Sequence, residues 1–192
     1  MAVAPTGILG GVFDPPHLGH VALAQAALRE LDLAVLLVLV VADPGHKRTA
    51  TPAETRLELA QLAFQEVERT TVELDPHART VDSLEERKAP DTVFVLGSDE
   101  LAAFSTWKSP RRILELVRLG VALRPGTSPG SVRAAAAELG AEGRIVEFEL
   151  EPHPISSSDI RDRVARGLPI DHLVPAKVAE AIRRLGLYSA PE

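Results

Sequence analysis

The stretch Gly10-Gly-Val-Phe-Asp-Pro-Pro-His-Leu-Gly-His20 separates a short apolar segment, Thr6–Leu9, from a longer segment, Val21–Leu31. Apolar residues recur in the longer segment at the three- and four-residue spacing of one helical face. The paired glycines remove side chains where a backbone must come close to a partner. The adjacent prolines suit the entrance of a helix but not its interior. The stretch therefore predicts a strand, a tight turn and the start of a helix.

The start of that helix is a candidate anion site. A helix N-terminus presents N–H groups without helical partners and a partial positive charge. His17 and His20 are three residues apart, which puts both side chains on the same side of the site. The turn alone is equally compatible with a structural role, and it is the combination with the histidines that favours binding.

Composition restricts the class of protein. The chain has 192 residues, 45% hydrophobic and 25% charged, which is ordinary for a globular protein with one core. The absence of cysteine excludes disulfides and thiol catalysis, and the net charge of −6 argues against nucleic acid as a main partner. No stretch approaches the roughly 20 apolar residues that span a bilayer, and the N-terminus does not resemble a signal peptide. We expect a cytoplasmic protein without a membrane partner, and the sequence carries no signal for a particular oligomeric state.

Apolar runs of strand length alternate with amphipathic segments along the chain. We expect strands at Thr6–Leu9, Ala34–Val41, Thr70–Leu74, Thr92–Leu96, Gly120–Leu123 and Arg144–Leu150. We expect helices at Val21–Leu31, Pro52–Glu66, Val81–Arg87 (with Thr80 or Asp82 as N-cap), Pro110–Arg118, Ser128–Leu139, Ser156–Arg166 and Pro175–Leu185. The alternation predicts an α/β fold with a doubly wound parallel sheet. We expect one domain over residues 1–192, with a C-terminal helical part at about 155–188.

The loops that follow the strands should meet at one edge of the sheet, where ligands bind in such folds. One of them, Ile155-Ser-Ser-Ser-Asp-Ile-Arg161, begins a predicted helix with three successive hydroxyl groups and is a second candidate phosphate site. Arg161 lies one turn from Ser157 and Ser158, so its planar guanidinium can bind the same anion. Such a helix start is by itself more often a cap, and its pairing with the first site favours phosphate binding.

These two segments resemble the signatures of the HxGH nucleotidyltransferases, in the same order. The first matches their His-x-Gly-His element, and Ser156–Arg161 is similar to their ISSTxIR element, which holds the nucleotide triphosphate. A dinucleotide oxidoreductase is the first rival within the fold class, but the glycine that follows Gly11 is Gly19, so no Gly-x-Gly-x-x-Gly turn is present. A Walker A loop is absent as well.

Further segments narrow the resemblance to the nicotinate mononucleotide adenylyltransferases. Gly97–Lys108 resembles their GxDxL…F..W(K) segment, and Gly45–Lys47 resembles their Pro-Pro-His-Lys loop. Thr80–Leu84 resembles their YTxDTL element, and Leu173–Tyr188 resembles their C-terminal ending. The chain departs from the family at Val12 (usually Thr or Ser), at Arg79 (a Tyr in the family) and at Ser83 (a Thr).

The resemblance implies a Rossmann-like nucleotidyltransferase that transfers the adenylyl group of ATP to nicotinate mononucleotide, giving nicotinate adenine dinucleotide and pyrophosphate in NAD biosynthesis. It implies that His17, His20 and Arg161 are catalytic. The substrate-binding residues that it implies are Gly10, Gly11, Val12, Phe13, Gly19, Lys47, Thr80, Gly97, Asp99, Trp107, Lys108, Arg124, Ile155, Ser156, Ser157 and Ser158. We expect no protein metal ligand, with Mg²⁺ arriving on ATP.

Three interpretations stay open beside this one. The substrate could be nicotinamide mononucleotide, the enzyme could be a pantetheine-phosphate adenylyltransferase, or the chain could be a non-catalytic nucleotide sensor. Donors at Thr106, Lys108 and Arg79 favour the acid form of the mononucleotide over the amide. Trp107 is interpreted as stacking on the pyridine ring, with a core tryptophan as the alternative.

Overall fold

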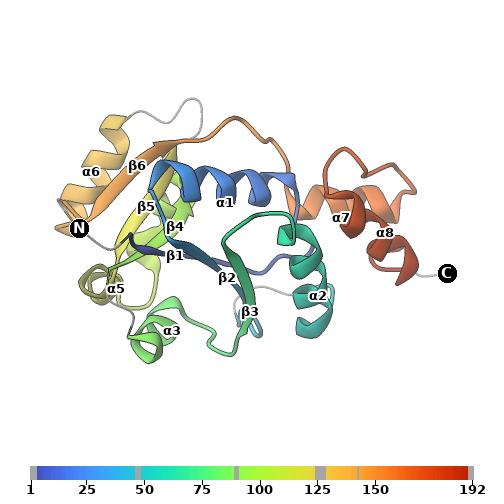
Figure 1. Ribbon diagram of the computed structural model, residues 1–192, viewed down its shortest axis with the longest axis horizontal. Helices are drawn as coiled ribbons and strands as arrows, with labels where there is room; N and C mark the ends of the chain where they lie inside the picture. The colour runs from blue at the N-terminus through green and yellow to red at the C-terminus, as the bar shows by residue number, and fades with distance from the viewer. Residues whose placement is uncertain (1–3, 46–48, 89–90, 124–128, 142, 190–192) are drawn as a thin grey trace.

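A computed structural model describes residues 4–45, 49–88, 91–123, 129–141 and 143–189 (Figure 1). Its centre is a six-stranded sheet in the order β3-β2-β1-β4-β5-β6, in which every neighbouring pair is parallel. The strands are β1 (Thr6–Gly11), β2 (Val35–Val41), β3 (Thr70–Asp75), β4 (Thr92–Gly97), β5 (Arg118–Leu123) and β6 (Ile145–Glu149). The predicted doubly wound parallel sheet is confirmed, and its switch point lies between β1 and β4.

Helices cover both faces of the sheet. They are α1 (Leu18–Glu30), α2 (Ala53–Phe64), α3 (Thr80–Arg87), α4 (Ser98–Ala103), the 3₁₀ turn η1 (Phe104–Thr106), α5 (Pro110–Leu116), α6 (Pro129–Leu139), α7 (Ser157–Ala165) and α8 (Ala176–Arg184). Figure 1 shows α1 and α3 on opposite sides of the strands, with α7 and α8 beside α2 at the end nearest the C-terminus. None of the helices in the described part of the chain is long and apolar enough to cross a membrane.

The buried strands explain why two helical layers are needed. Successive side chains of a strand point to opposite faces, so Leu9 and Val38 join the core under α1, α2, α7 and α8. Their neighbours Ile8 and Leu39 join a second core under α3, α4, α5 and α6. A continuous apolar run such as Val35–Val41 is thus covered on both faces, as expected of a parallel strand.

The structure differs from the predicted elements at three places. The segment Gly97–Trp107, for which no helix was predicted, forms α4 and η1, and the acidic first turn at Asp99 and Glu100 is the helix signal that favours this. The helix expected to reach Arg118 ends at Leu116, because the chain is already extended at Val117 and Arg118 pairs with Val93 of β4. In addition, α3 has Arg79 at its N-cap rather than Thr80 or Asp82.

A buried arginine holds the carboxyl ends of β1 and β2 together. Arg56 of α2 is 1% exposed. Its Nη1 donates to the carbonyl oxygens of Val12 (2.9 Å) and Val41 (2.7 Å), and its Nη2 donates to that of Ala42 (2.7 Å). Its Nε donates to the carbonyl oxygen of Thr51 at 3.3 Å, just before α2 begins. One guanidinium therefore ties the ends of two strands to the start of a helix.

Burial lowers the pKa of Arg56, and the negative charge of the nearby Asp14 carboxylate opposes that shift. An arginine keeps its proton at neutral pH despite such a decrease. Arg56 lies on the buried face of α2 with Leu59, Ala60 and Ala63, at helical spacing. That periodicity was visible in the sequence, and it would have placed the arginine inside the protein.

We expect Arg56→Met to destabilise the protein by roughly 3–5 kcal/mol, because several buried carbonyl groups lose a charged donor at once. The matched control is Arg184→Met on α8, whose partner Glu58 lies in an exposed ion pair at 2.8 Å. The control should cost no more than about 1 kcal/mol. Urea unfolding of both variants makes the comparison, and equal losses would show that the buried contacts are not special.

Candidate active site

The predicted turn between β1 and α1 places the two histidines side by side. His17 is the N-cap of α1, and its ring stacks on that of His20 with centroids 3.7 Å apart. The Nδ1 of His20 accepts the backbone N–H of His17 at 3.2 Å. Because Nδ1 is an acceptor, the proton of the neutral His20 ring lies on Nε2. His20 therefore offers an N–H donor at its far end.

The ring of Phe13 supports this arrangement. Phe13 has a φ of 52°, which is rare outside glycine, and its buried ring packs edge-on against His20 (centroids 5.0 Å) and Phe64 (5.7 Å). A Cβ on Gly11 would lie 2.7 Å from that ring, and one on Gly19 would lie 3.1 Å from the ring of His17. A side chain at position 11 would therefore displace the Phe13 ring, and one at position 19 would press tightly on the His17 ring.

Asp14 connects three distant parts of the chain. Its carboxylate is buried and accepts hydrogen bonds from the N–H of Ala50, from the Thr51 hydroxyl (2.8 Å) and from the Tyr188 hydroxyl (2.7 Å). Burial raises the pKa of Tyr188 well above its usual value, and the hydrogen bond to Asp14 adds to the shift. Tyr188 thus remains a protonated donor, and Asp14 fixes the loop before α2 and the C-terminal segment to the histidine turn.

The second predicted phosphate segment lies directly against the first. The Ser157 hydroxyl donates to the carbonyl oxygen of Pro15 at 2.8 Å, and Arg161 Nη1 donates to that of Asp14 at 2.7 Å. Arg161 Nη2 also donates to the Ser158 hydroxyl at 3.2 Å, so Arg161 lies beside a serine of this segment, and their binding of one anion stays a prediction. Two segments about 140 residues apart in the sequence therefore form one site.

Within the second segment, Ser156 has a capping role. It is the N-cap of α7, and its hydroxyl accepts the N–H of Asp159 at 3.1 Å. Ile155 is half-buried and packs against the core that lies under α1. In the first segment, Gly10 is the last but one residue of β1, and Val12 directly follows the strand. The Val12 carbonyl group accepts a hydrogen bond from Arg56.

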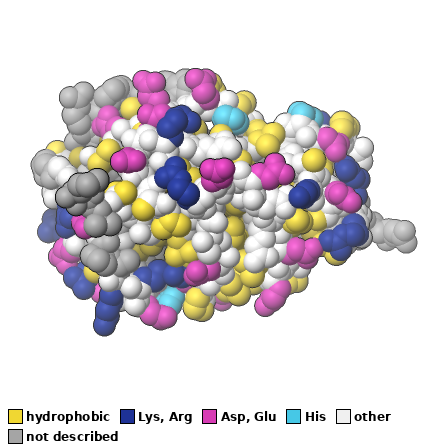
Figure 2. Space-filling view, viewed as in Figure 1, with side chains coloured by type: hydrophobic (Ala, Val, Ile, Leu, Met, Phe, Trp, Pro, Cys, Tyr) yellow, Lys and Arg dark blue, Asp and Glu magenta, His cyan; other side chains and the backbone are white. Residues whose placement is uncertain are grey.

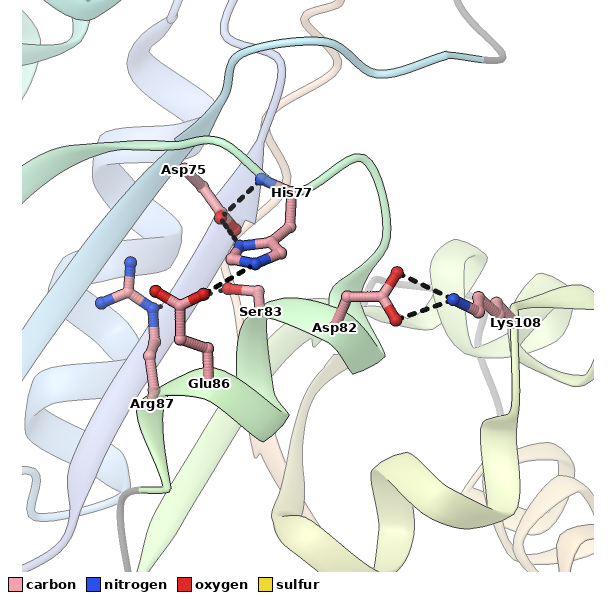
Figure 3. A network of polar contacts seen from close by, with 7 residues as sticks. All are labelled: Asp75, His77, Asp82, Ser83, Glu86, Arg87 and Lys108. Atoms are coloured by element: carbon pink, nitrogen blue, oxygen red, sulfur yellow. Dashed lines mark hydrogen bonds and ion pairs between the residues drawn. The ribbon is translucent and has the colours of Figure 1, made fainter.

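A separate group of predicted residues lies where α3 meets the segment after α4. Thr80 is the first residue of α3, and Trp107 follows η1. Trp107 is half-buried, with its ring 5.2 Å from that of Phe104 and 6.0 Å from that of Phe94. Lys108 Nζ donates to both carboxylate oxygens of Asp82 at 2.7 and 2.9 Å (Figure 3). The lysine that the sequence favoured as a substrate donor is thus paired with α3.

Four predicted residues remain, of which Gly97 and Asp99 lie in the described part of the chain. Gly97 ends β4, at the same sheet edge as the histidine turn, and Asp99 is exposed in the first turn of α4. Lys47 and Arg124 lie outside the described residues. Sequence reasoning missed the roles of Asp14 and Tyr188, although both stand inside quoted motifs.

Charge on the surface is mixed. Figure 2 shows Lys and Arg side chains interspersed with Asp and Glu side chains on this face, in keeping with the net charge of −6. The face seen in Figure 2 shows mixed charge, so the predicted phosphate site depends on a local arrangement of donors. The starts of α1 and α7, together with Arg161, provide one.

Comparison with known proteins agrees with this geometry. Residues 8–163 match the sequence model of the family described as cytidylyltransferase-like, which defines the class of the fold and of the site. A protein of Thermomicrobium roseum is 40% identical over 97% of this chain and 92% of its own length. A protein of Bordetella petrii is 38% identical over 95% of this chain and 97% of its own length. Both are described as "Probable nicotinate-nucleotide adenylyltransferase", and this chain belongs to the nicotinate-nucleotide adenylyltransferase family.

A solved structure shares the fold over nearly its whole length. The Plasmodium falciparum nicotinic acid mononucleotide adenylyltransferase, complexed with NaAD, superposes with a TM-score of 0.81. The alignment covers 97% of this chain and 98% of that chain at 16% sequence identity. At that identity the likeness concerns the arrangement of strands and helices.

Proposed function

We infer that this chain is an enzyme that transfers the adenylyl group of ATP to nicotinate mononucleotide, giving nicotinate adenine dinucleotide and pyrophosphate. The observation that carries this conclusion is the direct contact between the two helix starts, through Ser157 with Pro15 and Arg161 with Asp14. Two converging helix N-termini with a guanidinium between them suit a polyphosphate. Membership of the family supports the choice of ATP and of the mononucleotide.

The chemistry does not require a general base. The nucleophile is a phosphate monoester whose second pKa is about 6, so it is already largely ionised at neutral pH. Catalysis must bring two anions together and stabilise charge on the α-phosphate and on the leaving pyrophosphate. Preorganised hydrogen-bond donors are the groups suited to that task.

The donors can be assigned to roles. His20 presents its Nε2–H, and His17 stacks beside it at the start of α1. Arg161 is held in place by the Asp14 carbonyl group and the Ser158 hydroxyl before any phosphate binds, which lowers the cost of ordering it. We keep Lys47 and Arg124 as further phosphate donors and the backbone of Gly10–Phe13 and Gly19 as the close-approach surface.

Magnesium enters this scheme as part of the MgATP substrate. The buried carboxylate of Asp14, in the histidine turn, already accepts three hydrogen bonds, which leaves it poorly suited to hold a cation. Mg²⁺ commonly keeps several waters and binds phosphate oxygens, so ATP itself can carry it. A cytoplasmic location, where ATP is abundant, stays a prediction.

Arg161→Ala and His20→Ala should each lower kcat by roughly 100- to 1,000-fold, because each removes one preorganised donor to the transition state. The matched control is Arg163→Ala on the same helix, whose Nε donates to the carbonyl oxygen of Pro169 at 3.0 Å. The control should retain turnover. Pyrophosphate release with both substrates measures kcat, and near-normal turnover in either site variant removes that residue from the mechanism.

We assign the mononucleotide to the region of Thr80 and Trp107, where α3 meets the segment after η1. The half-buried ring of Trp107 has an aromatic neighbour at Phe104, and its remaining exposed part can stack on a pyridine ring. Trp107→Ala should raise KM for nicotinate mononucleotide about 5- to 10-fold or more and leave KM for ATP unchanged. The KM of Trp107→Phe for the mononucleotide should lie between those of the unchanged protein and of Trp107→Ala. A sharp fall in melting temperature with unchanged KM would make Trp107 a core residue.

The structure changes the argument for the acid form of the substrate. Lys108 is paired with Asp82, and the Thr106 hydroxyl donates to the Ala103 carbonyl group at 2.7 Å. The donors that we assign to the carboxylate are therefore the N–H groups at the start of α3 and the exposed Arg79 beside them. An amide would bring its own NH₂ group to these donors.

The test of the proposed function compares pyrophosphate release from ATP with nicotinate mononucleotide, nicotinamide mononucleotide and phosphopantetheine. We expect kcat/KM to be highest for the acid by roughly 10- to 100-fold, because an unmatched buried polar group costs about 1–3 kcal/mol. Equal values for acid and amide would mean that the pocket does not read the carboxylate. Activity with phosphopantetheine alone, or with no acceptor, would overturn the proposed function.

A further inference from the structure

His77 bridges the end of β3 and the second turn of α3. Its Nδ1 lies 3.0 Å from Asp75 Oδ1, and its backbone N–H donates to the same oxygen at 3.1 Å. Its Nε2 lies 3.0 Å from Glu86 Oε2. Figure 3 shows the ring between the two carboxylates, with Ser83 and Arg87 below it on α3. Both ring nitrogens thus face carboxylate oxygens.

The bridge is needed because α3 has no side-chain cap of its own. Arg79 occupies the N-cap position without a capping hydrogen bond, and only residues 76–79 connect β3 to the helix. On its other side, α3 is joined to the segment after η1 by the ion pair of Asp82 with Lys108 and by that of Glu85 with Arg112 (2.9 Å). The placement of α3, and with it of Thr80 in its first turn, therefore depends on contacts at both sides of the helix.

We propose that His77 is a positioning residue for the mononucleotide, because its bridge from Asp75 to Glu86 holds α3 and so places Thr80 against the substrate. The proposal rests on the proposed function, which assigns the mononucleotide to Thr80 and Trp107. It concerns KM for the mononucleotide, because the segments that we assign to ATP lie at the starts of α1 and α7, whereas His77 joins β3 to α3.

The bridge is complete only when the ring carries both protons. The hydrogen bond that the ring donates to Asp75 and the negative charges of Asp75 and Glu86 raise the pKa of His77 above its usual 6.5, while desolvation opposes the shift. A neutral ring has one N–H, and the buried Asp75 side chain (6% exposed) retains it in preference to Glu86 (72% exposed). The bare Nε2 then faces a carboxylate oxygen. Glu86 is therefore released as the pH rises through the raised pKa of His77.

Other charged groups lie around the bridge, and one ion pair among them also links β3 to α3. On the side of β3 and α3, Glu73 pairs with Arg87 at 3.4 Å. Arg87 Nε also donates to the Ser83 hydroxyl at 3.4 Å. The loop after β2 comes near Ala78, the neighbour of His77, at Gly45. The Asp43 carboxylate of that loop accepts the Gly45 N–H at 2.9 Å. Arg79, on the connecting segment itself, is exposed.

The first measurement is the pH dependence of KM for each substrate between pH 6.5 and 9, from pyrophosphate release by the full chain. We expect KM for nicotinate mononucleotide to rise about 3- to 10-fold with pH, the range that loss of one hydrogen bond produces. KM for ATP should stay flat. His77→Gln should show the raised KM for the mononucleotide already at pH 6.5 and no further rise.

Glu86→Gln separates positioning from simple packing. Its amide can accept from a ring N–H or donate to a bare Nε2, so the bridge survives in either form of the ring. This variant should keep the low KM at pH 6.5 and lose the rise at alkaline pH. The matched control is His172→Gln, at an exposed position, which should reproduce the profile of the unchanged protein.

Two results would overturn the proposal while leaving the proposed function intact. One is a profile for His77→Gln that matches the unchanged protein. The other is an equal change of kcat and of KM for ATP, which would make His77 a general structural residue. An unchanged protein that releases no pyrophosphate with the mononucleotide would instead overturn the proposed function, and this proposal with it.

Discussion

The site depends first on one buried cation. The carbonyl groups at the carboxyl ends of parallel strands have no partner in the sheet once the strands stop. Here three carbonyl groups at the ends of β1 and β2, and a fourth just before α2, accept hydrogen bonds from Arg56. A guanidinium suits this place because its planar fork donates in several directions and keeps its charge when buried. The same contact that stabilises the fold therefore fixes the turn that follows β1.

Asp14 continues this connection outward. It faces the loop before α2 and the Tyr188 hydroxyl with its carboxylate, while its carbonyl group receives Arg161. The two phosphate segments are thus joined through backbone groups, and their donor side chains are ordered by the protein itself. A site built in this way needs little rearrangement when phosphate binds, which is the property that electrostatic stabilisation of a transition state requires.

The other half of the site is built differently. Ion pairs and a doubly bound histidine place α3, and most of these side chains are partly exposed. Such contacts are individually weak and depend on pH and salt. The phosphate side of the site is therefore expected to be rigid, and the mononucleotide side to be the more adaptable one.

Much of this protein could be predicted from its sequence alone, because the signals are local. Continuous apolar runs such as Val35–Val41 indicate strands buried on both faces, and their alternation with amphipathic segments leaves one parallel topology class. The positions of His17 and His20 at a helix entrance follow from the glycines and prolines around them. The short α4 was missed, because its acidic first turn is a weak signal beside a loop-like composition.

The tertiary structure alone decided which charged groups meet. Lys108 pairs with Asp82, Asp14 accepts a hydrogen bond from Tyr188 among others, and each contact joins residues far apart in the chain. No local pattern encodes these pairs, because they depend on which strand neighbours which and on how far each helix reaches. The sequence by itself determined the sheet and the residue types at its binding edge. The packing of helices on that sheet determined which of those residues remain available to a substrate, since a charge already paired inside the protein is costly to separate.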